Sequence, residues 1–128
     1  PGRILGHEGI GYVVCKGNQV QKWEVGDRIL TSCITACGHC RHCCGVGRLY
    51  AFCERGGWQL GNTIDGMQAE YARIPHADYT AHALPASIPL QPSAKEDLYV
   101  MTSDILPTGF EIGLRSGRVP DSASIAIV

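Results

Sequence analysis

Short apolar runs separated by glycine-rich turns dominate much of the chain. Residues 9–14 are small and apolar and end at Lys16-Gly17-Asn18, while residues 23–30 predict a turn at Gly26-Asp27 that leads into a strand. Residues 69–74 alternate apolar and polar side chains, which is typical of a half-buried strand. Several short strands joined by glycine turns predict a mainly β fold, either a small barrel or a sandwich.

The pattern changes at the proline-rich residues 84–93, which we interpret as a connection. Residues 94–101 predict a helix that follows this connection. Ser93 would be its N-cap, and Glu96 lies three residues later, as in a capping box.

The C-terminal part predicts one more helix and then a strand. The helix runs from about residue 104 to residue 115, with Pro107 in its first turn, where proline is tolerated, and with Gly117 at its end. Residues 124–128 are typical of a buried parallel strand. Such a strand normally leads into a turn and a helix, so we expect this sequence to be an internal fragment of a longer protein.

Composition and charge restrict the class of partner. The chain has 128 residues, 45% of them hydrophobic, and a formal net charge of -1, which suits one globular domain. A nearly neutral chain is a poor ligand for nucleic acid or an anionic membrane, and no apolar run approaches the ~18 residues of a membrane span. The seven cysteines are an odd number and no signal peptide is visible, so we expect a reducing, cytoplasmic setting.

Five of the seven cysteines lie within residues 37–53. Cys37, Cys40 and Cys43 are separated by two residues each, so a tight turn can direct several thiolates at one centre, and Cys53 can close the site. Four thiolates in a closed tetrahedron are a ligand set of structural zinc. An iron–sulfur cluster, a disulfide set and simple buried cysteines are the alternatives, and we favour zinc because of the ligand type and spacing.

The remaining cysteines leave one choice open. Cys44 could replace Cys43 as the third ligand, and we prefer Cys43 because it keeps the spacing regular. Two histidines also lie in this segment, but four cysteines suffice. We interpret Cys15 and Cys33 as small core residues.

A second motif, Gly6-His7-Glu8-Gly9-Ile10-Gly11, places a histidine beside an acid between glycines that let the backbone approach a metal or ligand. Alone it is weak, because a single histidine is more often an ordinary surface or core residue. Followed by Val25-Gly26-Asp27-Arg28 and then by the cysteines, the motif resembles the medium-chain zinc-dependent alcohol dehydrogenase family in the same order.

The resemblance covers nearly the whole chain. Similarity to the bacterial alcohol and formaldehyde dehydrogenase branches continues through residues 57–61, 65–71, 75–78 and 103–111. The family implies a GroES-like catalytic-domain barrel with a structural-zinc lobe, then a helix and the first strand of a truncated Rossmann domain. We therefore expect residues 1–101 to form part of the GroES-like domain and residues 102–128 to form the linking helix and the start of the dinucleotide-binding domain.

The resemblance also implies roles for individual residues. His7 matches the catalytic-zinc histidine, and Glu8 matches the neighbouring acid, which lies near the metal and can exchange onto it. Asp104 aligns with the third zinc ligand, an aspartate in the formaldehyde and secondary-alcohol branches, although it could instead be a helix N-cap. Cys37, Cys40, Cys43 and Cys53 match the structural-zinc lobe, but the family spaces its third and fourth cysteines two residues closer.

The implied activity is hydride transfer from an alcohol or hydrated aldehyde to NAD or NADP, with zinc in a structural and a catalytic site. The implied partner is a small-molecule substrate, and the parent protein is expected to be a homo-oligomer. The family's first catalytic cysteine and its Gly-x-Gly-x-x-Gly cofactor motif are not in this sequence, so we expect these residues alone to be inactive. The alternative is a non-catalytic, zinc-stabilised GroES-like binding or structural module.

Overall fold

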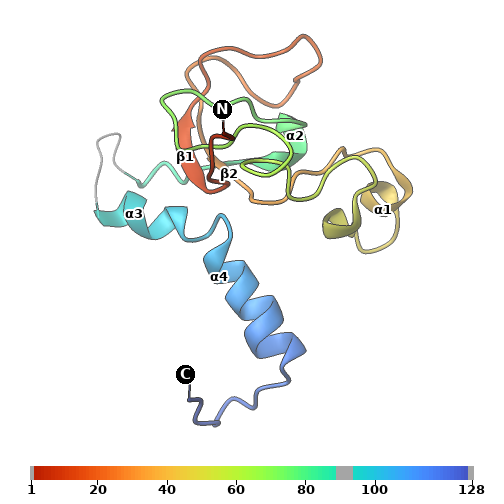
Figure 1. Cartoon of the computed structure of the whole chain (residues 1–128), viewed down its shortest axis with the longest axis vertical. Coiled ribbons are helices and arrows are strands. Elements are labelled where there is room, and N and C mark those ends of the chain that lie inside the picture. Colours follow the sequence, from red (N-terminus) through yellow and green to blue (C-terminus); the bar gives the residue numbers. More distant parts are fainter. Residues whose placement is uncertain (1, 89–93, 127–128) are drawn as a thin grey trace.

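A small antiparallel sheet lies at the centre of the computed structural model, which describes residues 2–88 and 94–126 (Figure 1). Strand β1 (Gly9–Tyr12) pairs with β2 (Arg28–Thr31), and β2 pairs on its other edge with β3 (Ala81–Ala83). The last three residues of β2 are buried, and neighbouring strands pair with both of its edges. The β architecture predicted from the glycine-punctuated runs is present in this sheet.

The turn predicted before β2 is confirmed. Gly26 has a φ of +98°, a left-handed conformation that a side chain would strain. Its N–H donates to the carbonyl of Val13 at 2.8 Å, and the N–H of Val13 donates to the carbonyl of Asp27 at 2.9 Å. The Asp27 carboxylate in turn accepts the N–H of Glu24 at 2.7 Å, so this turn supplies its own hydrogen bonds and sets where β2 begins.

One part of the core packs against this sheet. Trp23 is 5% exposed and lies with Ile29 and Ala81, and its indole Nε1 donates to the carbonyl of Ala77 at 2.9 Å. Ala77 begins helix α2 (Ala77–Thr80), which leads directly into β3. The indole thus satisfies its single donor while burying its rings, and it fastens α2 to the sheet.

A second part of the core lies in a lobe that extends from one side of the sheet (Figure 1). The lobe carries helix α1 (Arg41–Cys44) and the 3₁₀ turn η1 (Tyr50–Phe52). Its buried residues are mostly cysteines, with partly buried neighbours around them: Ala36, Cys37, Cys40, Cys43, Tyr50 and Cys53. So few apolar side chains leave this lobe with little hydrophobic stabilisation of its own.

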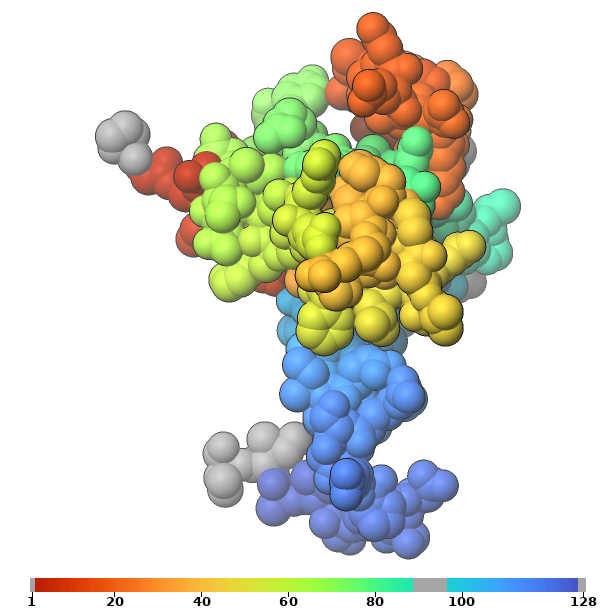
Figure 2. Space-filling model, turned by 90° about the vertical axis from the view of Figure 1, so that its right-hand side faces the viewer, coloured from red at the N-terminus to blue at the C-terminus, as the bar shows by residue number. Residues whose placement is uncertain are grey.

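The C-terminal part is helical up to Ser116, and its last helix projects away from the sheet (Figures 1 and 2). Helix α3 (Ala94–Val100) confirms the first predicted helix, whose proposed N-cap Ser93 lies outside the described residues. Helix α4 (Ile105–Thr108) confirms the second, with Pro107 in its first turn, and runs into the π-helical segment η2 (Gly109–Ser116).

Two predicted strands are wrong in the described residues. Residues 69–74 form no strand, because only residues 66–68, which precede them, make backbone hydrogen bonds to the N-terminal segment. Within residues 69–74, Tyr71 is 74% exposed. Residues 124–126 form no strand either, and Ile125 is 57% exposed with no sheet beside it; residues 127–128 lie outside the described residues. Apolar alternation shows that a segment could pair, but strand formation also requires a neighbouring edge.

The N-terminal segment that leads to His7 is held by close backbone contact with Gly66. The N–H of Gly66 donates to the carbonyl of Ile4 at 2.8 Å, and a Cβ built on Gly66 would lie 2.2 Å from the carbonyl oxygen of Gly6. The carbonyl oxygen of Gly6 belongs to the backbone, so it cannot rotate away from an added Cβ as a flexible side chain could.

Gly66→Ala is therefore expected to destabilise the fold by about 3 kcal/mol, the upper range for overpacking. Urea unfolding in the presence of excess zinc measures the change. Gly11→Ala is the matched control, because a Cβ there meets nothing within 4 Å. Equal unfolding midpoints for the two variants would show that the contact between these backbone segments is not tight.

Candidate functional site

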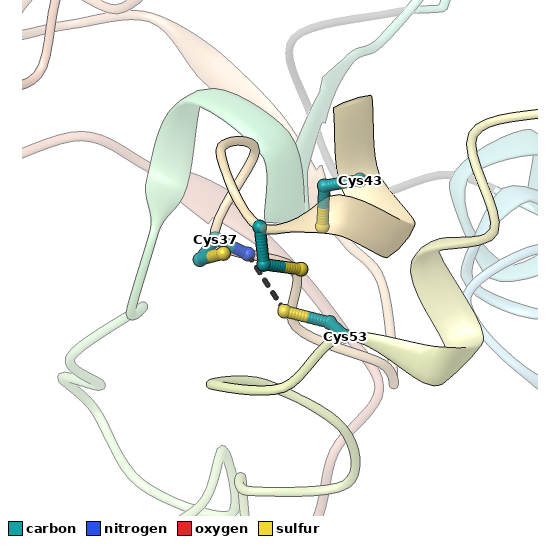
Figure 3. Close-up of side chains that lie close together, drawn as sticks. Cys37, Cys43 and Cys53 are labelled. Carbon is teal, nitrogen blue, oxygen red and sulfur yellow. Dashed lines mark hydrogen bonds between the residues drawn. The ribbon is translucent and has the colours of Figure 1, made fainter. Parts of the chain in front are cut away.

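The structure brings Cys37, Cys40, Cys43 and Cys53 together in the lobe. Their sulfur atoms all lie within 4.8 Å of one another, and among the described residues this is the one group of three or more such side chains placed to hold a metal ion. Figure 3 shows the sulfurs of Cys37, Cys43 and Cys53 directed toward a common centre. A zinc tetrahedron with bonds of about 2.3 Å has sulfur–sulfur edges of about 3.8 Å, so small side-chain movements would close the site.

Backbone hydrogen bonds support this arrangement, which we call the four-cysteine cluster. The N–H of Cys37 donates to Sγ of Cys53 at 3.2 Å (Figure 3). Gly38 follows in a left-handed conformation with a φ of +79°, and the ring of Tyr79 covers the position where a Cβ would lie. An ion pair of 2.7 Å between Arg41 and Glu54 joins the two segments that carry the cysteines.

Of the two candidates for the third ligand, Cys43 lies in the four-cysteine cluster and Cys44 does not. Cys43 is 3% exposed and lies in the cluster, whereas the exposed Cys44 directs its thiol to the carbonyl of Gly38 at 3.1 Å. The regular spacing of three cysteines therefore coincides with the inward side of helix α1. Cys44 lies one residue later, where the helix turns its side chain outward.

The thiols differ in how readily they ionise. The N–H of Glu54 lowers the pKa of Cys40 to about 6, whereas burial raises the pKa of Cys43 to about 12, and hydrogen bonds with neighbouring thiols add to the rise. A divalent cation would remove this difference, because coordination deprotonates a thiol outright. Four soft sulfur donors, buried and aided by backbone N–H groups, fit a structural zinc ion.

His7 and Asp104 meet although 97 residues separate them in the sequence. Nε2 of His7 lies 2.8 Å from Oδ2 of Asp104, and the two side chains are 29% and 24% exposed. The ring of Trp58 stands edge-on to the His7 imidazole with centroids 5.5 Å apart. His7 precedes β1 and Asp104 precedes α4, so the pair lies where the helical part joins the sheet.

Asp104 occupies the N-cap position of α4, but its carboxylate bonds no backbone N–H of that helix. Oδ1 instead accepts the hydroxyl of Thr108 at 2.5 Å, and Oδ2 faces His7. The hydrogen bond from Thr108, followed by those from His7 and the Cys33 thiol, holds the pKa of Asp104 below its usual value, although burial opposes this. Asp104 is thus an anion directed at an imidazole, a suitable pair of donors for zinc.

Cys33 is a site residue that the sequence analysis missed. It lies beside Asp104, and burial raises the pKa of its thiol to about 11, with the negative charge of Asp104 adding to the rise. No spacing motif marks Cys33, because Asp104, its neighbour in space, is 71 residues away in the sequence. The two residues are brought together only by the fold. Cys15, also predicted as a core residue, is exposed, so that prediction is wrong.

A cavity of about 760 Å³ opens beside His7 and Asp104. Its apolar lining includes Leu30, Ile34, Trp58 and Ile112, and its polar lining includes Cys33 and Ser103. The Ser103 hydroxyl is buried and has no hydrogen-bond partner among the described residues. An apolar cavity with a few polar groups at one point is the usual form of a small-molecule site, and here the polar groups surround the His7–Asp104 pair.

No helix among the described residues has both the length and the apolar character needed to cross a bilayer.

Comparison with known proteins identifies the family. Residues 1–86 of the 128 match the model of the alcohol dehydrogenase GroES-like domain. A glutathione-independent formaldehyde dehydrogenase of Pseudomonas aeruginosa is 36% identical over 136 residues, covering 94% of this chain and 32% of that protein. The zinc-type alcohol dehydrogenase B of Aspergillus flavus is 35% identical over 109 residues, covering 85% of this chain and 24% of that protein. The chain spans about a third or less of these relatives.

Solved structures agree with this assignment. The apo form of zinc dependent alcohol dehydrogenase 2 from Streptococcus pneumonia has a TM-score of 0.74 at 46% identity, covering 92% of this chain and 30% of that chain. Alcohol dehydrogenase TADH from Thermus sp. ATN1 has a TM-score of 0.70 at 33% identity, covering 92% and 33%. These likenesses confirm the predicted GroES-like fold class, though not the Rossmann part. The chain belongs to the alcohol dehydrogenase GroES-like domain family.

Proposed function

We propose that this chain supplies the zinc-binding, substrate-side part of an oxidoreductase that transfers hydride from a small alcohol or hydrated aldehyde to NAD or NADP. The observation that carries the proposal is the meeting of His7 and Asp104 beside one apolar cavity. Relatives named as formaldehyde and zinc-type alcohol dehydrogenases support this substrate class.

Two groups of residues would hold zinc under this proposal. The four-cysteine cluster would hold a structural ion that stabilises the lobe, and His7 with Asp104 would contribute ligands to a catalytic ion. When bound, the catalytic zinc supplies a Lewis acid that lowers the pKa of the substrate hydroxyl, and a nicotinamide supplies the hydride acceptor.

The other site residues would act on the substrate and on the ligands. Trp58 stands against His7 and would limit the space for a substrate beside it, while the buried Leu30 contributes to the apolar lining of the cavity. Thr108 fixes one carboxylate oxygen of Asp104, which leaves the other directed at His7. In this proposal residues 1–101 belong to the catalytic domain and residues 102–128 connect it to a dinucleotide-binding domain, in a homo-oligomeric cytoplasmic parent.

A metal titration tests the proposal. We expect the chain, with its four-cysteine cluster already loaded with zinc, to bind one further equivalent of cobalt(II) more weakly. Addition of a small alcohol should change the visible absorption of this cobalt, and His7→Ala should abolish the signal while the zinc stays bound. We also expect these 128 residues to show no alcohol-dependent reduction of NAD or NADP on their own.

The opposite result would favour the other function. A chain that holds one zinc in the four-cysteine cluster, and whose His7 and Asp104 bind no second metal, would be a zinc-stabilised structural or binding module without catalysis.

A further inference from the structure

The helix that runs from Ile105 to Ser116 is hydrogen-bonded to the sheet part at its start. Three consecutive residues at the start of α4 each bond to a residue of the other part. The bonds join Cys33 N–H to the Ser103 carbonyl at 3.2 Å, His7 Nε2 to Asp104 Oδ2 at 2.8 Å, and Ile105 N–H to Glu8 Oε1 at 3.4 Å.

Beyond this place the helix has little to hold it. Every residue from the start of α4 to the end of η2 is exposed, and the helix projects away from the sheet (Figures 1 and 2). The direction of the helix, and with it the position of the Asp104 carboxylate, therefore depends on the bonds at the helix start.

The first turn of a helix has backbone N–H groups without helical partners, and its N-cap residue usually accepts one of them. Asp104 holds the N-cap position of α4 but makes no such bond, because its carboxylate faces Thr108 and His7. The half-buried Glu8 accepts the N–H of Ile105 instead, from the opposite segment. Its negative charge also suits the positive end of the helix dipole.

We propose that Glu8 is a positioning residue that caps helix α4 from the neighbouring segment and so leaves the Asp104 carboxylate available to a metal beside His7. This inference rests on the proposed role of His7 and Asp104 as metal ligands. The role proposed for Glu8 depends on its carboxylate oxygen as the hydrogen-bond acceptor for the N–H of Ile105.

Substitutions at Glu8 separate the acceptor from the charge. Glu8→Gln keeps an oxygen that can accept the N–H of Ile105, whereas Glu8→Ala removes both the oxygen and the charge. Glu70→Ala, at an exposed glutamate, is the control. None of these substitutions touches the four-cysteine cluster, so stoichiometric zinc in each variant shows that the lobe is folded.

The first readout is the rate of amide hydrogen exchange at Ile105. NMR spectra of the full, zinc-loaded chain measure this rate. Loss of the cap should speed exchange about fivefold in Glu8→Ala, with Glu8→Gln and Glu70→Ala close to the unmodified chain. Unchanged exchange at Ile105 in Glu8→Ala would overturn the proposal, because the cap would then contribute nothing.

The second readout is cobalt(II) affinity at His7 and Asp104, which should fall about tenfold in Glu8→Ala, as for other partners that orient ligands. Glu8→Gln should restore it. Equal losses in both variants would overturn the proposal, since the charge of Glu8 would then be acting on the metal. If the unmodified chain binds no cobalt(II) at these residues, the proposed function fails, but exchange at Ile105 still decides the role of Glu8.

Discussion

Cys43→Ser is expected to remove most of the zinc affinity of this chain, whereas Cys44→Ser is expected to leave it unchanged. Structural zinc binding in small domains is worth about 10–16 kcal/mol, so the loss of one of four thiolates should weaken it about a hundredfold or more. Cys43 is buried among the other three sulfurs, while Cys44 is exposed and bonded to a carbonyl. The adjacent positions make an unusually close pair of test and control.

The measurement is zinc content per chain after dialysis against a weak chelator, with NMR spectra of the lobe. Because the lobe buries little besides cysteines, loss of zinc should disorder it, and a strong chelator should produce the same spectra in the unmodified chain. Zinc retained in Cys43→Ser but lost in Cys44→Ser would mean that the third ligand is Cys44 and that helix α1 is rotated from its position here.

The sequence is most informative where the chemistry is local. Cys37, Cys40 and Cys43 are close in the sequence, so their spacing limits how a turn can place them, and the expected grouping with Cys53 is what the fold contains. The turn at Gly26 and the helix with Pro107 in its first turn also follow from local conformational preferences.

The parts that sequence reasoning missed depend on distant neighbours. The alternation of apolar and polar side chains in residues 69–74 predicts a half-buried strand, but among the described residues no neighbouring strand pairs with this segment. Cys33 lines the cavity only because the residues that follow β2 lie against the start of α4. The meeting of His7 with Asp104 was implied by family resemblance, since no periodicity connects residues so far apart.

Asp104→Ala and His7→Ala are each expected to abolish binding of the second metal ion while leaving zinc in the four-cysteine cluster. Substitution of residues that merely orient a ligand costs about 10–100-fold in metal affinity, so the loss of a ligand itself should cost at least about a hundredfold. Cobalt(II) titration of the zinc-loaded chain measures this loss, and elemental analysis checks the zinc.

Asp104→Asn distinguishes a role of Asp104 as a metal ligand from a role in beginning helix α4. An amide oxygen can still accept the Thr108 hydroxyl, which donates to Oδ1 at 2.5 Å, so the start of α4 should persist. The negative charge beside His7 is lost, however, and a neutral amide is a poor zinc ligand. We expect Asp104→Asn to bind cobalt(II) nearly as weakly as Asp104→Ala but to keep the helix signals, whereas Asp121→Asn, on the exposed C-terminal segment, should change neither. If Asp104→Asn and Asp104→Ala both kept the second metal at full affinity, Asp104 would serve only to begin the helix.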